Sequence, residues 1–307
     1  MPIQQEVWLN DLAENIYPDN SFVLKSKDET ENVDYRTVHR PQEGGAPEVA
    51  RNGTPPPPAG NNYQRTDEVL SYDVDYYRSR KTVVTNLEQK ESSYDKRASV
   101  LGSHSKQLEK YTAAWTANLW AYKYDATNPV GQAIRTTGDP RAAMALGATG
   151  NRASITLDDI LKAKSFLDDW DIALEGRVAL LPSFMYNDLL KIPEVIDAMK
   201  ADRYAMPTGV VGNLFGFEIM QRSTVLTYNN GTNLDKQNPF TSLGTGNAAA
   251  LFWHPDFVAH AKGGLDIFVT EQDPDLYGDA FSAEVRVGAS PVYKNGKGIV
   301  TLVEAAA

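Results

Sequence analysis

The stretch SYDKRASVLGSHSKQLEKYTAAWTANLWAY, residues 93–122, contains no proline and places its apolar residues on one helical stripe. Ser92 followed three residues later by Asp95 resembles a capping box at the start of such a helix. At 1.5 Å per residue the helix would be roughly 44 Å long, well above the usual three to four turns. We therefore expect a spine that supports other elements. The stripe consists of Tyr94, Ala98, Leu101, Leu108, Tyr111, Trp115, Leu119 and Tyr122.

Two alternating stretches before this helix predict a long hairpin. Apolar and polar residues alternate over 33–37 and again over 70–76, which is the period of a strand. Between them, ten of the twenty residues from 41 to 60 are proline or glycine, so neither a helix nor a paired strand continues there. A two-stranded ribbon is marginal alone in water, and this one needs a partner surface. Its candidate subunit-contact residues are Tyr35, Tyr72, Val74 and Tyr76.

Downstream of the spine, the pattern predicts several shorter helices. Thr156 is suited to cap one of them, and Asp158 and Asp159 favour its positive end. We expect the inner stripe of that helix to be Leu157, Ile160, Leu161 and Leu167. Further helices are expected over 183–192, over 193–200 and from Pro255 through His260.

Strand patterns occupy the rest of the chain. Short apolar runs predict buried strands at 177–181, 215–220 and 248–253. The tail from 267 to 303 is β-rich throughout, and Asn295-Gly296 is typical of a hairpin turn. Such a tail must return to pack on something earlier in the chain. The fold class is therefore α+β.

Bulk composition excludes several classes of protein. The chain has 307 residues, a formal net charge of -10 and no cysteine. The acidic balance excludes a general cationic surface for nucleic acid, although it leaves room for a local basic patch. Without cysteine there are no disulfides and no thiolate metal sites. We find no signal peptide and no run of eighteen apolar residues, so we expect a cytoplasmic protein that does not enter membranes.

Motifs that carry chemistry are scarce. Among the four histidines, none has the spacing of a metal-binding pair, and His254 and His260 would lie on different faces of a helix. The run GATGNRAS, 147–154, lacks the Gly-Lys-Ser/Thr ending of a phosphate loop and is better read as a connector. No serine elbow or dinucleotide fingerprint occurs. We therefore expect no catalytic residue and no cofactor.

One acidic segment comes closest to a metal site. In DPDLYGDAFSAE, 273–284, the residues Asp273, Asp275 and Glu284 match part of the spacing of a calcium loop. Tyr277, however, stands where an oxygen ligand is needed, and the flanks are strands rather than helices. We interpret the segment as a turn with solvated acids, so this metal site is only a weak candidate.

The order of these elements resembles the major capsid proteins of tailed bacteriophages, whose shared architecture is the Hong Kong 97 fold. Five segments look similar to phage capsid sequences at corresponding places: 82–101 (TVVTNLEQKESSYDKRASVL), 155–169 (ITLDDILKAKSFLDD), 178–190 (VALLPSFMYNDLL), 212–223 (GNLFGFEIMQRS) and 248–264 (AAALFWHPDFVAHAKGG). The resemblance implies an N-terminal arm over 1–30, an extended hairpin loop over 31–90 and a peripheral domain with the spine helix over 91–175. It also implies an axial domain over 176–264 and strands over 265–307 that return to the peripheral domain.

The same resemblance implies a structural function rather than an enzymatic one. Hexamers and pentamers of the chain would form an icosahedral head around packaged double-stranded DNA, held by non-specific contacts. The shell would assemble in the cytoplasm of a bacterial host, with scaffolding, portal and decoration proteins as candidate partners. Neither Lys81 nor Asn295 matches the crosslinking positions of some family members, so we expect no crosslink. The alternative is an encapsulin-type shell protein that encloses cargo enzymes.

Overall fold

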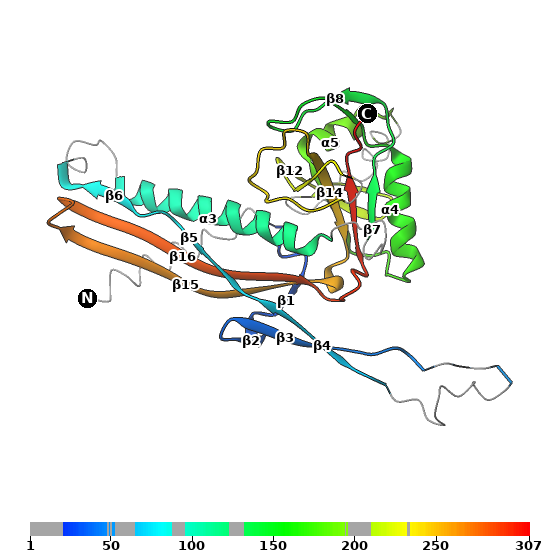
Figure 1. Cartoon of the computed structure of the whole chain (residues 1–307), viewed down its shortest axis with the longest axis horizontal. Helices are drawn as coiled ribbons and strands as arrows, with labels where there is room; N and C mark the ends of the chain where they lie inside the picture. Colours follow the sequence, from blue (N-terminus) through cyan, green and yellow to red (C-terminus); the bar gives the residue numbers. More distant parts are fainter. Residues whose placement is uncertain are drawn as a thin grey trace.

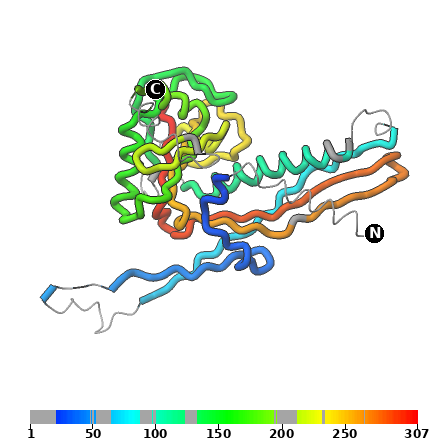
Figure 2. The backbone as a smooth tube through the Cα atoms, turned by 180° about the vertical axis from the view of Figure 1, so that it is seen from behind, coloured from blue at the N-terminus to red at the C-terminus, as the bar shows by residue number. Residues whose placement is uncertain are grey.

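The computed structural model describes residues 21–47, 49, 51–52, 65–87, 96–122, 132–193, 195, 210–231 and 234–307. The molecule has three parts, which we call the body, the extension and the hairpin (Figure 1). The extension and the hairpin leave the body in opposite directions, as the view from behind also shows (Figure 2). Several expectations fall outside the described residues: most of the N-terminal arm, the Ser92–Asp95 cap, the hairpin tip and most of 193–200.

The body is built on a seven-stranded sheet with the order β11-β12-β10-β14-β17-β7, and β13 pairs with β14. Among the described residues, the helices α4 and α5 and a small two-stranded sheet, β8-β9, also belong to this part. The strands are β7 (Gln132–Arg135), β8 (Pro140–Ala142), β9 (Asn151–Ala153), β10 (Arg177–Pro182), β11 (Val210–Leu214), β12 (Phe217–Arg222), β13 (Leu226–Tyr228), β14 (Asn247–Trp253) and β17 (Ile299–Val303). The helices are α4 (Leu157–Asp169) and α5 (Ser183–Leu189).

The central strands β10 and β14 are mostly apolar because both of their faces are buried. In β14, Leu251 and Trp253 enter the core beside the spine helix, whereas Ala250 and Phe252 enter the core beneath α4 and α5. Strand β10 divides its residues between the two cores in the same way. The buried strands expected at 177–181 and 248–253 are thus confirmed.

The extension consists of one long helix on a ribbon of strands. Helix α3 (Lys96–Trp120) covers one face of a sheet with the order β1-β15-β16-β5, in which β6 also pairs with β16. Its own core is small and forms around Leu108 of the helix and Val285 of the sheet. The strands are β1 (Lys27–Asp28), β5 (Asp75–Arg78), β6 (Thr82–Thr85), β15 (Val258–Asp273) and β16 (Gly278–Pro291).

The spine helix is confirmed, but its most buried face is not the predicted stripe. Of that stripe, Leu108 is buried, whereas Trp115 and Leu119 are only half-buried. The deepest position is Trp120, whose indole Nε1 donates to the carbonyl of Ala259 over 2.8 Å. Small residues on the neighbouring ridge of the helix let its backbone approach the body. The pattern of large apolar residues in the sequence does not reveal this buried ridge. Its small residues are Ala113, Ala114 and Ala117.

The C-terminal end of α3 is held by a loop of the body. The ammonium of Lys236 donates to the carbonyls of Asn118 and Ala121, both over 2.6 Å. A cation at this end complements the helix dipole and satisfies carbonyls that have no partner within the helix. The hydroxyl of Tyr228 donates to the carbonyl of Tyr122 over 2.6 Å. Burial lowers the pKa of Lys236 to about 8.

The capping box of α4 is confirmed, since Thr156 Oγ1 accepts from the amide of Asp159 and the Asp159 carboxylate accepts from the amide of Thr156. Its inner stripe is confirmed at Ile160 and Leu167, but Leu161 is exposed. Helix α5 ends at Leu189, earlier than expected.

Two local predictions in the tail are wrong. The segment from Pro255 is a single turn of 3-10 helix that ends at Phe257, and the chain then enters β15. His260 is therefore a strand residue, because β1 and β16 pair with this part of β15 on either side. Likewise, Asn295-Gly296 does not close a hairpin, since β16 pairs with β15 whereas β17 pairs with β14 and β7. Here the turn carries the chain from the extension back to the body.

The division between body and extension follows strand pairing across the chain, and the domain boundaries implied by the resemblance stay a prediction. Helix α4, expected within the peripheral domain of 91–175, packs in the body against β7 and β17. Strand β17, expected to return to the peripheral domain, completes the sheet of the body. The extension takes β15 from residue 258 onward. Pairing between strands far apart in sequence decides this division, and local patterns do not report it.

The two tryptophans of α3 provide a direct test of the buried face. We expect Trp120→Ala to lower the free energy of unfolding by about 3–5 kcal/mol, because it opens a cavity at the centre of the molecule. The half-buried Trp115 serves as the matched control, and Trp115→Ala should cost only about 1 kcal/mol. Denaturant unfolding of the two variants measures the difference. Equal losses would show that Trp115 and Trp120 are buried to the same extent, which would contradict the orientation of α3 described above.

The buried Lys236 predicts a pH dependence. Its folded-state pKa of about 8 lies below the ordinary value of 10.5, so between these values the unfolded chain binds more protons. Stability must then rise with pH through that window. Relative to Lys236→Met, the wild type should gain about 2 kcal/mol between about pH 7.5 and 10. A constant difference between the two unfolding curves would contradict the burial of this ammonium.

Candidate subunit-contact surfaces

The hairpin begins to project from the rest of the molecule at Val74, between the end of β4 (Glu68–Asp73) and the start of β5. Before Val74, β4 pairs with β3 (Thr37–Gln42), which also pairs with β2 (Val33–Asp34); after it, β5 pairs with β16. Val74 itself is only 2% exposed and packs against Val38 and Ala261. What looked like one strand over 70–76 therefore belongs to two sheets, and Val74 is the point that joins them.

A buried ion pair fixes the base of the hairpin. The guanidinium of Arg40 on β3 donates to both carboxylate oxygens of Glu29, and both side chains are almost fully buried. Arg40 also donates to the carbonyl of Pro291 over 3.1 Å, which connects the hairpin to the end of β16. The hydroxyl of Tyr72 donates to Glu29 over 3.0 Å. Burial, and then the negative charge of Glu29, raise the pKa of Tyr72, so its hydroxyl stays a donor.

His260 lies beside this ion pair and attaches the N-terminal segment to β15. Its Nδ1 lies 2.8 Å from the hydroxyl of Ser26, and its Nε2 lies 4.0 Å from the carboxylate of Asp28. Burial lowers the pKa of His260, although Asp28 and Glu29 act in the opposite direction. This histidine has a structural explanation, as does His254, whose Nδ1 accepts from the amide of Asp256.

Beyond its base the hairpin projects away from the rest of the molecule (Figure 1). The ladder of β3 and β4 runs from Thr37 paired with Asp73 to Gln42 paired with Glu68. Val69 on this ladder is exposed, as is Val49 further out. An exposed ribbon with apolar side chains is a surface that a second chain can cover.

The four predicted contact residues have different surroundings. Tyr35 is 95% exposed in the turn between β2 and β3, where its φ of 51° shows that the strand expected over 33–37 is interrupted. Tyr76 is 52% exposed on β5. Tyr72 is half-buried in the hairpin base and Val74 is buried, so the chain itself covers them. Tyr35 and Tyr76 remain accessible to a partner.

Further exposed apolar residues were not found by sequence analysis. Phe268 on β15 is 55% exposed on the face of the sheet opposite Ile267, which packs toward α3. The alternation over 266–270 could have revealed it. Leu146, between β8 and β9, is 95% exposed, and no periodic signal marks it because it lies in a connector.

A groove of about 620 Å³ runs between α3 and β5. Tyr76, Arg78 and Arg80 line one side of it, and His104 and Tyr111 line the other. The guanidinium of Arg78 lies over the ring of Tyr76, 4.4 Å from its centroid. Exposed aromatic and arginine side chains of this kind are enriched in protein interfaces.

The structure does not bring the three acidic metal candidates together. Asp273 ends β15 and accepts from the amide of Asp275 in the turn, over 3.0 Å. Glu284 lies six residues along β16 from Gly278, the partner of Asp273, which is about 20 Å of extended strand. There it forms an ion pair with Arg78 at 2.5 Å. Across the described ranges, no group of three potential metal ligands gathers.

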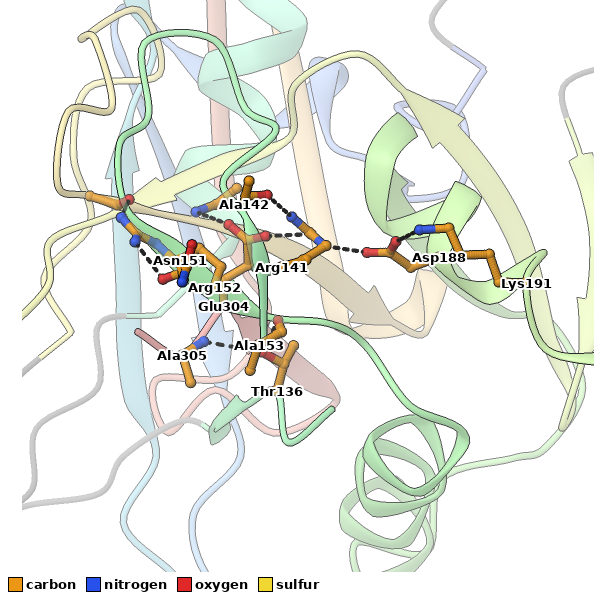
Figure 3. Close-up of polar contacts among 12 residues, drawn as sticks. Thr136, Arg141, Ala142, Asn151, Arg152, Ala153, Asp188, Lys191, Glu304 and Ala305 are labelled. Carbon is orange, nitrogen blue, oxygen red and sulfur yellow. Dashed lines mark hydrogen bonds and ion pairs between the residues drawn. The ribbon is translucent and has the colours of Figure 1, made fainter. Parts of the chain in front are cut away.

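A dense polar cluster in the body has a structural role (Figure 3). Arg141 on β8 lies between Asp188 of α5, at 2.5 Å, and Glu304 after β17, at 2.7 Å. Lys191 makes a second ion pair with Asp188. Burial raises the pKa of Glu304, against the effect of Arg141. Every charge drawn here has a partner within the chain, so the cluster fastens β8 and the C-terminal segment to the body.

The expectation that the chain does not enter membranes can be compared with the helices of the structure. Within the described part of the chain, no helix combines the length and apolarity needed to cross a lipid bilayer.

No family model and no curated protein matches this sequence. Solved structures do match it. A chain of Mycobacterium phage Che8 has a TM-score of 0.60 at 16% identity, covering 92% of this chain and 90% of that one. The capsid of Ralstonia phage GP4 gives a TM-score of 0.62 at 13% identity, covering 92% and 87%. A virus-like particle from Pyrococcus furiosus gives 0.53 at 11% identity, covering 97% and 98%.

These likenesses extend over nearly the whole chain. They show that the chain has the Hong Kong 97 fold, as the order of elements in the sequence predicted.

The ion pair at the hairpin base predicts an asymmetric mutational response. Arg40→Met should destabilise the protein by about 3–5 kcal/mol, because it leaves the carboxylate of Glu29 buried and unpaired. Adding Glu29→Gln should recover most of that loss. The control is Arg36→Met, since the Arg36–Asp75 pair at 3.4 Å is exposed and should contribute less than about 1 kcal/mol. If the double variant is as unstable as Arg40→Met in denaturant unfolding, the proposed role of the pair is wrong.

Proposed function

We propose that this chain is the major capsid protein of a tailed bacteriophage, which assembles as hexamers and pentamers into an icosahedral head. The single observation that carries this proposal is a fold shared over about nine-tenths of the chain with solved phage capsid structures. An extension with a small core and a projecting hairpin are what a shell subunit needs, because copies of the chain supply the missing cover.

The surfaces described above suggest how neighbouring copies meet. The exposed carboxylates of the hairpin are paired within the chain, Glu43 and Asp67 with Arg65 and Glu68 with Lys294, so the ribbon offers mainly its exposed apolar side chains to a partner. The groove between α3 and β5 carries Arg78 and Arg80 together with the exposed ring of Tyr76. An exposed ribbon and a groove lined by aromatic and arginine side chains favour a hairpin lying along the groove of a neighbour.

A shell protein needs no catalytic centre, and we propose that the chain is not an enzyme. Its site of action is the virion capsid, with assembly in the cytoplasm of the bacterial host. The packaged double-stranded DNA would touch the wall through local contacts, since the net charge of -10 opposes a general attraction. Scaffolding, portal and decoration proteins are the partners expected of such a shell.

The alternative is an encapsulin-type compartment that encloses cargo enzymes. One observation favours it: the structural match with the virus-like particle from Pyrococcus furiosus covers 97% of this chain and 98% of that particle's chain. The two phage structures named above give higher TM-scores, 0.60 and 0.62 against 0.53. Electron microscopy of particles from a producing culture separates the two, because DNA-filled heads with tails support the phage shell and untailed shells around protein support the compartment.

The hairpin provides the test of assembly. Replacing residues 43–67 by Asn-Gly would join Gln42 to Glu68, which already face each other in the ladder, through a tight turn. We expect a folded subunit with nearly unchanged thermal unfolding and a severe loss of closed particles in negative stain.

The exchange Arg65→Gln is the matched control, because it changes the same segment by one charge and leaves its length intact. It should assemble normally. Particles formed at wild-type yield by the shortened variant would contradict the proposed role of the hairpin.

A further inference from the structure

A groove of about 590 Å³ lies on the other side of the spine helix, between α3 and the loop that leads to β14. Lys106 and Lys110 line it from the helix, and Arg222 lines it from the end of β12. The opposite wall carries Thr241 and Ser242. Sequence analysis left room for a local basic patch, and this groove is the place where the structure gathers one.

Its charge is opposite to that of the chain. Three cations face one carboxylate, Glu109, within a protein of net charge -10. Lys106 and Lys110 are exposed and lie one helical turn apart on the same face of α3. Within the described ranges neither ammonium forms an ion pair. Both are therefore available to a negatively charged ligand.

Arg222 adds a half-buried charge to the lining of the groove. Its Nη2 donates to the carbonyl of Lys110 over 3.2 Å, and its guanidinium lies over the ring of Phe22. Its Nη1 is buried and has no hydrogen-bond partner in the described structure. Burial lowers the pKa of Arg222 to about 10, against the effect of Glu109. An anion in the groove would compensate a charge that the protein leaves poorly solvated.

The remaining polar lining is made of hydroxyls rather than further acids or amides. Ser223 and Thr224 follow Arg222, across from Thr241 and Ser242. Ammonium groups and hydroxyl donors around one groove are the usual ligands of phosphate oxygens in protein contacts to a nucleic-acid backbone. A carboxylate ligand would use the same charges, but it has fewer acceptor oxygens for the hydroxyls.

From these observations we infer that the groove binds the phosphate backbone of nucleic acid. This inference rests on the proposed function, in which the shell encloses DNA, and it names the residues through which one subunit would touch it. Two or three phosphate contacts per subunit give weak and salt-sensitive binding. Such contacts add up over many copies in a shell without fixing the DNA at any single site.

The test uses unassembled wild-type subunits and a fluorescently labelled DNA duplex, with binding followed by anisotropy at several salt concentrations. Lys106→Gln combined with Lys110→Gln should reduce the slope of log K against log salt by about 2, since each lost phosphate contact removes about 0.9. The matched control is Lys162→Gln combined with Lys164→Gln on α4, which removes the same charge from another exposed helix. It should leave the slope unchanged.

The inference is overturned by no binding by wild-type subunits, by an equal loss of slope in both double variants, or by displacement of the duplex by polyglutamate as readily as by unlabelled DNA. The last result would identify a site for acidic polypeptides. Particle yield of the Lys106/Lys110 variant is measured in parallel by negative stain. Normal shells with unaltered DNA binding would refute this inference alone, whereas absence of shells from wild-type protein would refute the proposed function.

Discussion

The molecule depends on one aromatic joint. Trp120 at the end of the spine helix, Trp253 at the end of β14 and Phe22 of the N-terminal segment meet with ring centroids 5.6 to 6.4 Å apart. Each comes from a different part of the chain, and both indole nitrogens donate to backbone carbonyls, of Ala259 and Lys25. The joint therefore fixes how the extension sits on the body. A buried aromatic residue of this kind contributes several kcal/mol to stability, and the small residues Ala113 and Ala117 of α3 pack in the same core.

Away from this joint, the extension and the hairpin have little core of their own. The extension packs one helix on one face of a sheet and leaves aromatic side chains such as Tyr76 and Phe268 on its surface. The hairpin is fastened at its base by the buried pair of Arg40 and Glu29, and beyond the base it is a ribbon. An ion pair orients the hairpin without covering it. In the proposed shell, the apolar surface that remains would make association between copies favourable.

Much of the fold could be predicted from the sequence, because several helices and strands carry local signals. The length of the spine, the capping box at Thr156 and the buried strands of the body all follow from periodicity and end signals. What could not be predicted depends on contacts distant in sequence. Val74 looks like any strand residue, yet it is where the chain changes sheets. His260 follows a proline that can open a helix, but pairing with β1 and β16 holds it in a strand. The basic groove needs Arg222 to come beside Lys110, 112 positions earlier.

The central claim is that other copies of the chain cover the hairpin. Amide hydrogen exchange tests it most directly, with peptides from β3 and β4 compared between unassembled subunits and closed particles. Since unassembled subunits leave the ribbon open to water, its amides should exchange fast there and become protected by at least about tenfold on assembly, while those of β14 stay protected in both states. Equal exchange of β3 and β4 in the two states would contradict the account.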